Sequence, residues 1–339
     1  MLAAIRDYLN TLTQAYNDSR IHYCRLEAVH WEDGRCRLAG VVLDTDTAAD
    51  LFLALATRFP ATTFITEGVR ILRRVEPTLL TVGTHLVGLY REPSFLAEML
   101  SQLLNGEPLE VLDERERWVF VRQEDGYLGW TYRPYLVDEP TPAATHRVAA
   151  GICLLRAEPL PAAPLVGRLF AGTRVRVEAT TDGWSALRAA GGLAGWAMAA
   201  ELRPLSALPD TPTARRQQMV ADALTLMGVP YLWGGTTALG CDCSGFVRLL
   251  HTLAGLSIPR DADMQFAAGR PVEPPFRPGD LLFFHSPGGH RQITHVGMSL
   301  GGWRMIHSSR ARNGVYEDDV QAVPHLRESF VAGRTFCGD

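Results

Sequence analysis

One cysteine and two histidines in the last third of the chain have the types and the setting that nucleophilic catalysis requires. Cys243 follows a glycine-rich turn and stands where a helix is predicted to begin. Amide groups and the helix dipole at such a position favour the thiolate over the thiol. His295 and His307 lie within strand-like apolar runs. An imidazole beside the cysteine would complete a thiolate–imidazolium pair, and the second histidine would orient the first.

The pairing of the two histidine strands decides whether this triad can form. A two-residue turn at Gly301-Gly302 would put His295 and His307 on opposite faces of the sheet. A three-residue loop or one bulge would make the two imidazoles diagonal neighbours on one face. The catalytic interpretation therefore requires the odd-length loop.

A zinc site is an alternative, since the same three residues together with Cys241 supply four ligands of suitable type. A Cys-x-Cys spacing at a helix start directs its thiols apart, whereas zinc motifs usually place two to four residues between cysteines. A buried cysteine is otherwise most often a small core residue, and a strand histidine is most often structural. Cysteine catalysis is favoured, with no metal or other cofactor.

The elements that must position these residues follow from capping signals and apolar spacing. Thr211 is the predicted cap of a helix that stops at Gly228. A second helix is predicted from Cys243, with apolar residues at helical spacing until Gly255 ends it. Strands of an antiparallel sheet are predicted over 280–284, 293–299 and 303–308.

The two segments before this domain repeat each other at a displacement of 66 residues. The markers are Gly106, Trp118 and Trp130 in the first copy and Gly172, Trp184 and Trp196 in the second. Short alternating runs with Asp-Gly turns indicate small β-barrels, with the tryptophans as core residues. This pattern resembles tandem bacterial SH3 domains.

Before the repeats, residues 1–78 predict a small α/β unit without recognisable chemistry. A helix over 2–16 precedes two strands around the Asp33-Gly34 turn. Asp44 or Thr45 is the predicted cap of a second helix, which ends near Phe59.

Composition excludes several classes of function. All 33 basic residues are arginine, so no lysine-based chemistry is available, and the net charge of −4 gives no electrostatic basis for binding nucleic acid. The first residues lack the apolar core of an export signal, and no run is long enough to span a membrane. Six cysteines in 339 residues do not make a disulfide framework. We expect a soluble cytoplasmic protein, for which a monomer is plausible.

Several motifs of the last domain resemble one family. The runs 229–235 and 242–247 are similar to the signature of NlpC-type cell-wall peptidases, which are papain-like cysteine peptidases acting on peptidoglycan peptides. The resemblance covers 213–339, and about 80–339 when the SH3-like repeats are included. Within the family, the chain is most similar to the γ-D-glutamyl-L-diamino acid endopeptidases that recycle murein peptides inside the cell. The later segments that agree are 258–261, 279–284, 294–297 and 305–308.

The resemblance implies a role for each site residue. Cys243 would be the nucleophile, His295 the general base and acid, and His307 the orienting group. Tyr231 would lie near the oxyanion site, and Ala262 stands where relatives are expected to carry a hydroxyl residue. The residues implied to bind substrate are Tyr231, Trp233, Asp242, Ser244, Glu92, Tyr127, Arg260 and Asp261.

These inferences predict a multidomain α+β protein that hydrolyses the γ-D-glutamyl bond to a diamino acid. Its substrate would be a murein tri- or tetrapeptide whose free N-terminal L-Ala ammonium group is bound by Glu92 and Asp242. The alternatives are a lysin acting on intact wall, an inactive wall-binding module, and a cysteine amidase or acyltransferase. The predicted domains are a small α/β domain at 1–78, SH3-like barrels at 79–140 and 147–207, and a papain-like α+β peptidase domain at 213–339.

Overall fold

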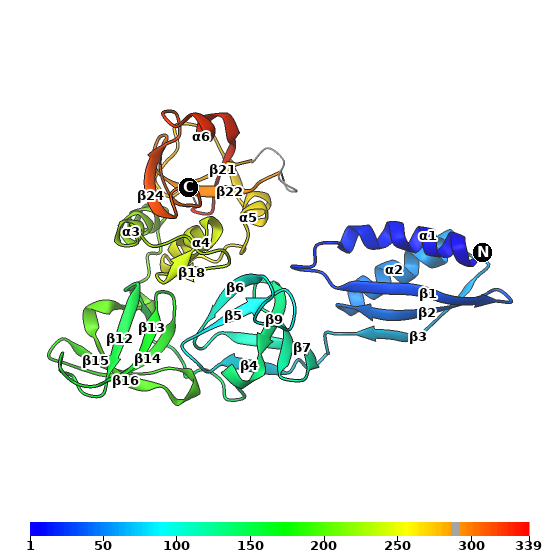
Figure 1. Cartoon of the computed structure of the whole chain (residues 1–339), viewed down its shortest axis with the longest axis horizontal. Helices are drawn as coiled ribbons and strands as arrows, with labels where there is room; N and C mark the ends of the chain where they lie inside the picture. The colour runs from blue at the N-terminus through cyan, green and yellow to red at the C-terminus, as the bar shows by residue number, and fades with distance from the viewer. Residues whose placement is uncertain (286–291, 339) are drawn as a thin grey trace. The chain divides into compact units, whose positions relative to one another are not determined.

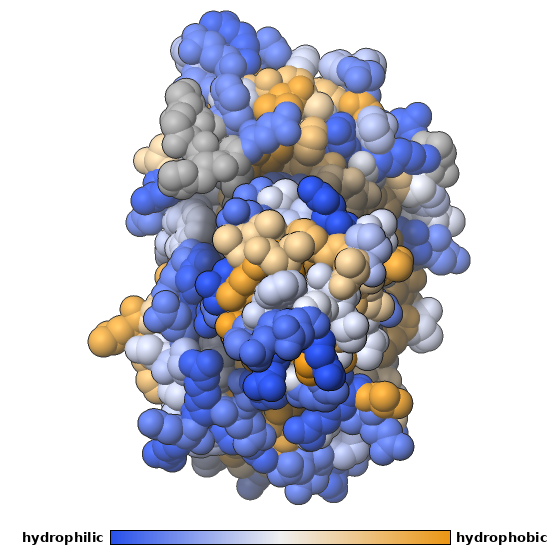
Figure 2. All heavy atoms as spheres, turned by 90° about the vertical axis from the view of Figure 1, so that its right-hand side faces the viewer, coloured by the Kyte–Doolittle hydropathy of each residue, from blue (hydrophilic) through white to orange (hydrophobic). Residues whose placement is uncertain are grey.

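The computed structural model describes residues 1–285 and 292–338. The chain forms two compact units, Met1–Leu80 with Leu109–Arg133, and Thr81–Pro108 with Pro134–Asp339 (Figure 1). Within the described residues, no helix combines the length and the apolar character that crossing a membrane demands. Hydrophilic side chains lie among hydrophobic ones on the face in Figure 2, in keeping with a mean hydropathy of −0.01.

The first unit begins with the predicted α/β fold. Its three strands are ordered β1-β2-β3, with β1 antiparallel and β3 parallel to β2. Asp33 and Gly34 both have positive φ in the β1–β2 turn, and Asp44 caps α2 by accepting from the Thr47 N–H. Both expectations are confirmed, whereas β3 was not predicted. The elements are α1 (Leu2–Thr13), β1 (Cys24–Glu32), β2 (Arg35–Val42), α2 (Thr45–Arg58) and β3 (Thr63–Ile71).

The predicted repeat is confirmed strand by strand. The Gly106 N–H donates to the Val82 carbonyl and the Gly172 N–H donates to the Val148 carbonyl, both at 2.9 Å. The first copy comprises β4 (Leu79–Val82), β5 (Leu86–Tyr90), β6 (Met99–Leu104), β7 (Pro108–Arg115), β8 (Trp118–Arg122), β9 (Leu128–Tyr132) and β10 (Leu136–Val137). The second comprises β11 (His146–Val148), β12 (Ile152–Arg156), β13 (Leu165–Phe170), β14 (Arg174–Thr181), β15 (Trp184–Arg188), β16 (Ala194–Met198) and β17 (Leu202–Pro204).

The tryptophans of the repeat divide between the two copies. Trp118 and Trp130 are buried, as expected of core residues, whereas Trp184 and Trp196 are only half-buried. The core of the second copy consists instead of aliphatic side chains such as Leu155 and Leu169, together with Cys153. The repeat therefore preserves the strands more closely than the packing.

The C-terminal part packs helices against a six-stranded sheet of order β20-β25-β21-β22-β23-β24. Thr211 caps α3 as predicted, and α4 packs on β22 and β23, which are the strands that carry the two histidines. The helices are α3 (Pro212–Thr225), α4 (Cys243–Leu253), α5 (Ala262–Ala268) and α6 (Pro324–Ser329). The strands are β18 (Thr236–Thr237), β19 (Gly240–Cys241), β20 (Arg270–Val272), β21 (Leu281–Phe284), β22 (His295–Gly301), β23 (Arg304–Ser309), β24 (Gly314–Asp319) and β25 (Phe330–Thr335).

Candidate active site

Cys243 is the first residue of α4, as predicted. Asp242 caps the helix by accepting from the Gly245 N–H at 2.7 Å. Gly245 itself is required there, because a Cβ would lie 2.2 Å from the Gly235 carbonyl oxygen. The close approach packs the glycine-rich loop against the first turn of α4 and leaves Cys243 only 9% exposed.

Burial opposes ionisation of this cysteine. Loss of solvent and, to a smaller extent, the neighbouring Asp242 together raise the pKa of Cys243 to about 12. Hydrogen bonds from the Val296 and Ser244 backbone oppose the rise but do not cancel it. Burial also holds the pKa of His295 well below its usual value. Desolvation therefore opposes the thiolate that the helix start favours, and the resting thiolate stays a prediction.

The two histidines meet on one face of the sheet. Met298 pairs with Ile306, and an irregularity between Ser299 and Gly301 supplies the extra residue that the catalytic interpretation required. As a result, the His295 Nε2 lies 2.7 Å from the His307 Nδ1. The odd-length connection is confirmed.

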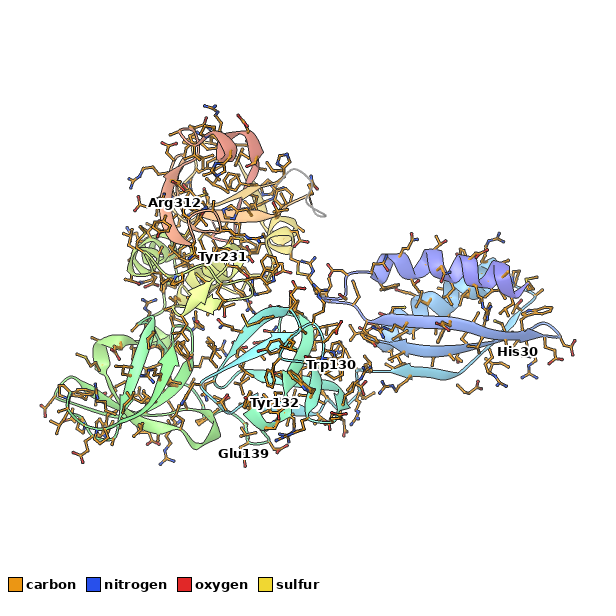
Figure 3. All side chains as sticks on the ribbon, viewed as in Figure 1. His30, Trp130, Tyr132, Glu139, Tyr231 and Arg312 are labelled. Carbon is orange, nitrogen blue, oxygen red and sulfur yellow. The ribbon has the colours of Figure 1, made fainter. Side chains whose placement is uncertain are left out.

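A carboxylate that the sequence analysis missed extends this chain. The His307 Nε2 lies 2.9 Å from the Asp318 Oδ2, and the Arg312 Nη1 donates to the Asp318 Oδ1 at 2.9 Å. On the neighbouring strand β24, Tyr316 pairs with His307, so Asp318 is a diagonal neighbour. Alternation along β24 would have indicated Asp318 only if the register of that strand had been known. Figure 3 labels Arg312.

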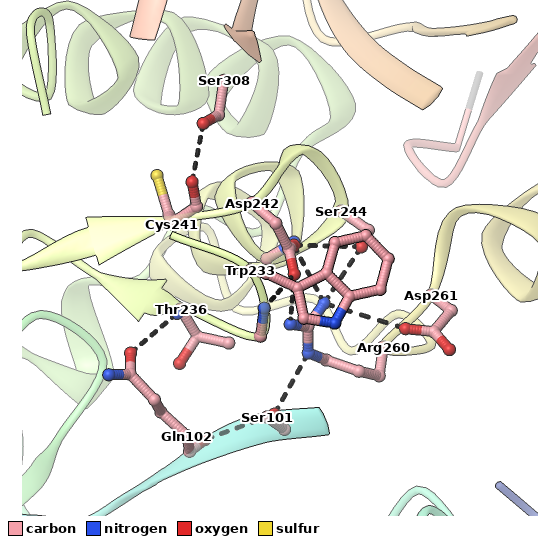
Figure 4. Close-up of polar contacts among 12 residues, drawn as sticks. Ser101, Gln102, Trp233, Thr236, Cys241, Asp242, Ser244, Arg260, Asp261 and Ser308 are labelled. Atoms are coloured by element: carbon pink, nitrogen blue, oxygen red, sulfur yellow. Dashed lines mark hydrogen bonds and ion pairs between the residues drawn. The ribbon is translucent and has the colours of Figure 1, made fainter. Parts of the chain in front are cut away.

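The N-cap carboxylate is held by a buried arginine. The side chain of Arg260 is 1% exposed and meets Asp242 through two contacts, Nη2 to Oδ2 at 2.7 Å and Nη1 to Oδ1 at 3.1 Å. Its Nη1 also donates to the Ser244 hydroxyl at 3.0 Å, and its Nε donates to the Ser101 hydroxyl at 3.1 Å (Figure 4). Strand β6 of the first SH3-like copy is thereby joined to the residue that precedes the cysteine.

Asp242 is therefore not available as a substrate carboxylate. Besides Arg260, its oxygens accept from the Gly234 N–H at 2.9 Å and the Gly245 N–H at 2.7 Å. The residue is 6% exposed. The expectation that Asp242 binds an ammonium group is wrong, because its charge is already neutralised inside the protein. Ser244, 5% exposed, belongs to the same network.

Strand β6 and the loop before it make further contacts with the glycine-rich loop. The Gln102 Oε1 accepts from the Thr236 N–H at 2.9 Å (Figure 4). The Trp233 Nε1 donates to the Glu98 carboxylate at 3.0 Å, while the indole remains 56% exposed. Trp233 is thus held at the protein surface, and its role in substrate binding stays a prediction.

The other predicted site residues are placed unequally. Tyr231, labelled in Figure 3, lies close enough to Cys243 that a thiolate there would raise the pKa of the phenol, which burial already raises. Asp261 lies 3.9 Å from the Arg260 guanidinium and keeps 18% of its side chain exposed. Glu92 is exposed in the loop between β5 and β6. Tyr127 is 2% exposed and belongs to the first unit, so its substrate role stays a prediction.

A helix-borne cysteine packed against an antiparallel sheet that carries a histidine pair is the arrangement of a papain-like cysteine hydrolase. Comparison with protein families places the chain more narrowly. Residues 228–334 match the NlpC/P60 family, residues 89–131 match the bacterial dipeptidyl-peptidase Sh3 domain, and residues 149–204 match the bacterial SH3 domain. These matches lie inside the predicted domains, whose limits stay predictions.

Similar proteins agree with this assignment. The chain is 30% identical over 246 residues to dipeptidyl-peptidase 6 of Lysinibacillus sphaericus, covering 68% of this chain and 87% of that protein. It is 29% identical over 235 residues to the gamma-D-glutamyl-L-lysine dipeptidyl-peptidase of Bacillus cereus, covering 63% and 68%. A solved NlpC/P60 family structure from Bacillus cereus has a similar fold, with a TM-score of 0.67 at 21% identity over 77% of this chain and 100% of that one. The chain belongs to the NlpC/P60 family.

Proposed function

We propose that this protein is a cysteine endopeptidase that hydrolyses the γ-D-glutamyl bond to a diamino acid in murein peptides. The family and the names of its dipeptidyl-peptidase relatives support the reaction class. The observation that carries the proposal is the hydrogen-bonded pair His295–His307, 2.7 Å apart on the strands against which the cysteine helix packs. A buried thiol on a helix that packs against the strands of a hydrogen-bonded imidazole pair suits acyl transfer better than it suits a wall-binding module.

The reaction proceeds through a thioester. The Cys243 sulfur attacks the γ-carbonyl carbon of the glutamyl residue while its proton passes to His295. The C–N bond then breaks as His295 returns this proton to the amine of the diamino acid. Water attacks the thioester, His295 takes the water proton, and the departing sulfur is reprotonated. The products are L-Ala-D-Glu and the diamino acid or the peptide that begins with it.

Two donors are suited to the oxyanion that forms during attack. The Cys243 backbone N–H is at the first position of α4, where a helix offers it no acceptor of its own. Burial raises the pKa of Tyr231, so the phenol keeps its proton and can donate it as a hydrogen bond. A developing negative charge beside the sulfur is thereby stabilised without a metal ion.

The proposed substrate class depends on Glu92, an exposed carboxylate of the first SH3-like copy. With Asp242 neutralised by Arg260, we propose that the exposed Glu92 binds the ammonium group. Intact peptidoglycan lacks this ammonium group, because its L-Ala nitrogen is acylated. We therefore propose free murein tri- and tetrapeptides as substrates, and peptide recycling in the cytoplasm as the setting.

The test compares one tripeptide, L-Ala-γ-D-Glu-diamino acid, with its N-acetylated copy. We expect kcat/KM for the capped peptide to be at least ~30-fold lower, because the cap leaves a recognition carboxylate without its partner. Glu92→Gln should lower kcat/KM for the free peptide and reduce the ratio of kcat/KM between the free and the N-acetylated peptide. Glu158→Gln is the matched control, since Glu158 occupies the equivalent position of the second copy. Equal rates on capped and free peptides, together with release of fragments from intact wall, would instead indicate a lysin.

A further inference from the structure

The chain of hydrogen bonds that begins at His295 ends at a carboxylate rather than at the second histidine. His307 is 2% exposed and bonds on both sides, to the His295 Nε2 at 2.7 Å and to the Asp318 Oδ2 at 2.9 Å. Asp318 keeps 17% of its side chain exposed. Three side chains on three adjacent strands are thereby linked in a single line.

The donors and acceptors along this line can be assigned from its far end. An ionised carboxylate can only accept, so the His307 Nε2 must carry a hydrogen. In the neutral imidazole, the His307 Nδ1 is then an acceptor, and the His295 Nε2 must donate to it. His295 is left with an unprotonated Nδ1, the ring nitrogen that remains for the thiol. The hydrogen bond from His307 lowers the pKa of Asp318, consistent with an ionised carboxylate.

We propose that Asp318 is a positioning residue that fixes the tautomers of both histidines, so that the His295 Nδ1 is the base that receives the Cys243 proton. This inference rests on the proposed peptidase function. Asp318 acts through His307 and touches no reacting atom. Its role corresponds to that of the third member of a serine-protease triad, moved one imidazole further from the nucleophile.

Arg312 makes the assignment directional. It donates to the Asp318 Oδ1 at 2.9 Å while its guanidinium lies 4.3 Å from the centre of the Tyr316 ring. The side of residue 318 that faces Arg312 must therefore be an acceptor. In Asp318→Asn, the amide oxygen would turn toward Arg312 and the NH₂ group toward His307. The reversed polarity would leave the His295 Nδ1 protonated and unable to accept from the thiol.

Kinetics on the free tripeptide with the full-length protein test this role. Asp318→Asn should lower kcat by about 10²- to 10⁴-fold with KM changed only a few-fold, as expected of a reversed tautomer. Asp318→Glu should recover part of the loss because it restores a carboxylate. Asp319→Asn is the matched control for charge and should stay within about twofold of the unmodified protein, because Asp319 bonds only to backbone N–H groups of its own turn among the contacts described.

The double variant Asp318→Asn/Arg312→Ala distinguishes an effect on the histidine tautomers from a general structural loss of activity. Removing Arg312 lets the amide flip and accept from His307, so kcat should rise at least about tenfold above that of Asp318→Asn alone. A merely structural role predicts that the second substitution adds to the loss. A kcat for Asp318→Asn equal to that of the unmodified protein, or no recovery in the double variant, would overturn the proposal.

Histidine ¹⁵N spectra of the unmodified protein provide a test that does not depend on any variant folding. We expect a pyrrole-type Nε2 and a pyridine-type Nδ1 for both His295 and His307 at neutral pH. A His307 with two protonated nitrogens, or a protonated His295 Nδ1, would contradict the assignment. Because the spectra need no substrate, failure to cleave the tripeptide would count against the proposed function and leave this inference separately tested.

Discussion

The two SH3-like copies have the same order of strands, displaced by 66 residues. They nevertheless contact opposite ends of α4 through residues that are not at equivalent positions. Strand β6 of the first copy bonds Arg260 through Ser101, whereas the equivalent position of the second copy is Gly167. The second copy donates from Arg147 to the Thr252 carbonyl and from Arg203 to the Leu253 carbonyl. Duplication has therefore supplied two supports with different chemistry.

The difference between these two sets of contacts indicates which of them affects the reaction. Ser101 holds the arginine that neutralises the N-cap carboxylate, one residue before Cys243. Arg203 acts at the other end of an 11-residue helix, about 15 Å away, where a cation satisfies the last carbonyls and complements the helix dipole. We expect the first support to control catalysis and the second to control stability.

The largest expected effect is the pH dependence of Cys243 alkylation at the N-terminal end of α4. Because burial raises the pKa of Cys243 to about 12, its thiolate fraction should rise tenfold per pH unit through the neutral range. The rate of alkylation by iodoacetamide should therefore increase by about 10³-fold between pH 6 and pH 9. Mass spectrometry locates the label, and Cys243→Ala shows the background from the other cysteines. A rate that is flat over this range would indicate a preformed thiolate–imidazolium pair.

Arg260→Met should cause the next largest effect. It leaves the Asp242 carboxylate buried without its counter-ion, a loss of about 3–5 kcal/mol in the free energy of unfolding. Activity should fall at least about 100-fold, because the cap of α4 moves with Asp242. Urea unfolding and kcat measure the two losses. Arg260→Lys keeps the charge but not the paired contacts, so its stability and its kcat should lie between those of Arg260→Met and those of the unmodified protein. A stable and fully active Arg260→Met would contradict the claim that the contact between the first copy and Arg260 controls catalysis.

Ser101→Ala removes a single neutral partner from Arg260. A hydrogen bond to a charged group contributes about 1.5–3 kcal/mol, so stability should fall by about that amount. We expect kcat to drop by about tenfold with KM nearly unchanged, because the arginine is held less firmly against Asp242. An unchanged kcat in a folded Ser101→Ala protein would show that the contact from β6 to Arg260 does not affect catalysis.

Arg203→Met should produce the smallest change in activity. It removes a bidentate pair with Asp222, at 2.9 and 3.0 Å, and the donor to the Leu253 carbonyl. The free energy of unfolding should fall by about 1–3 kcal/mol, whereas kcat/KM per folded molecule should stay within about twofold. Loss of kcat comparable to that of Ser101→Ala would show that the two ends of α4 are not separate.

The sequence was sufficient for the elements that carry Cys243, His295 and His307, because these elements depend on local signals. Thr211, the start of α4 at Cys243 and the two histidine strands follow from caps and apolar spacing, and the structure has all of them. The bulge beside Gly301 did not follow, since glycines at 301 and 302 permit an even or an odd connection. Sequence could state the condition for catalysis without deciding whether it is met.

The contacts that were missed or wrongly assigned are long-range. Arg260 meets Ser101 across 159 residues of sequence, and no pattern near either residue indicates the pairing. Asp242 has the residue type of a substrate carboxylate, but its partners neutralise it. Asp318 needed the register of β24, and the thiol required a comparison between desolvation and the helix dipole. Each depends on tertiary packing rather than on residue type.

The most direct measurement of the central claim is product analysis by mass spectrometry after incubation with L-Ala-γ-D-Glu-diamino acid. The account predicts L-Ala-D-Glu and the diamino acid as the only products. It also predicts no turnover by Cys243→Ala and near-normal turnover by Cys337→Ala, a control at another buried cysteine. An uncleaved tripeptide with folded protein, cleavage at the L-Ala bond, or equal turnover by Cys243→Ala would contradict it.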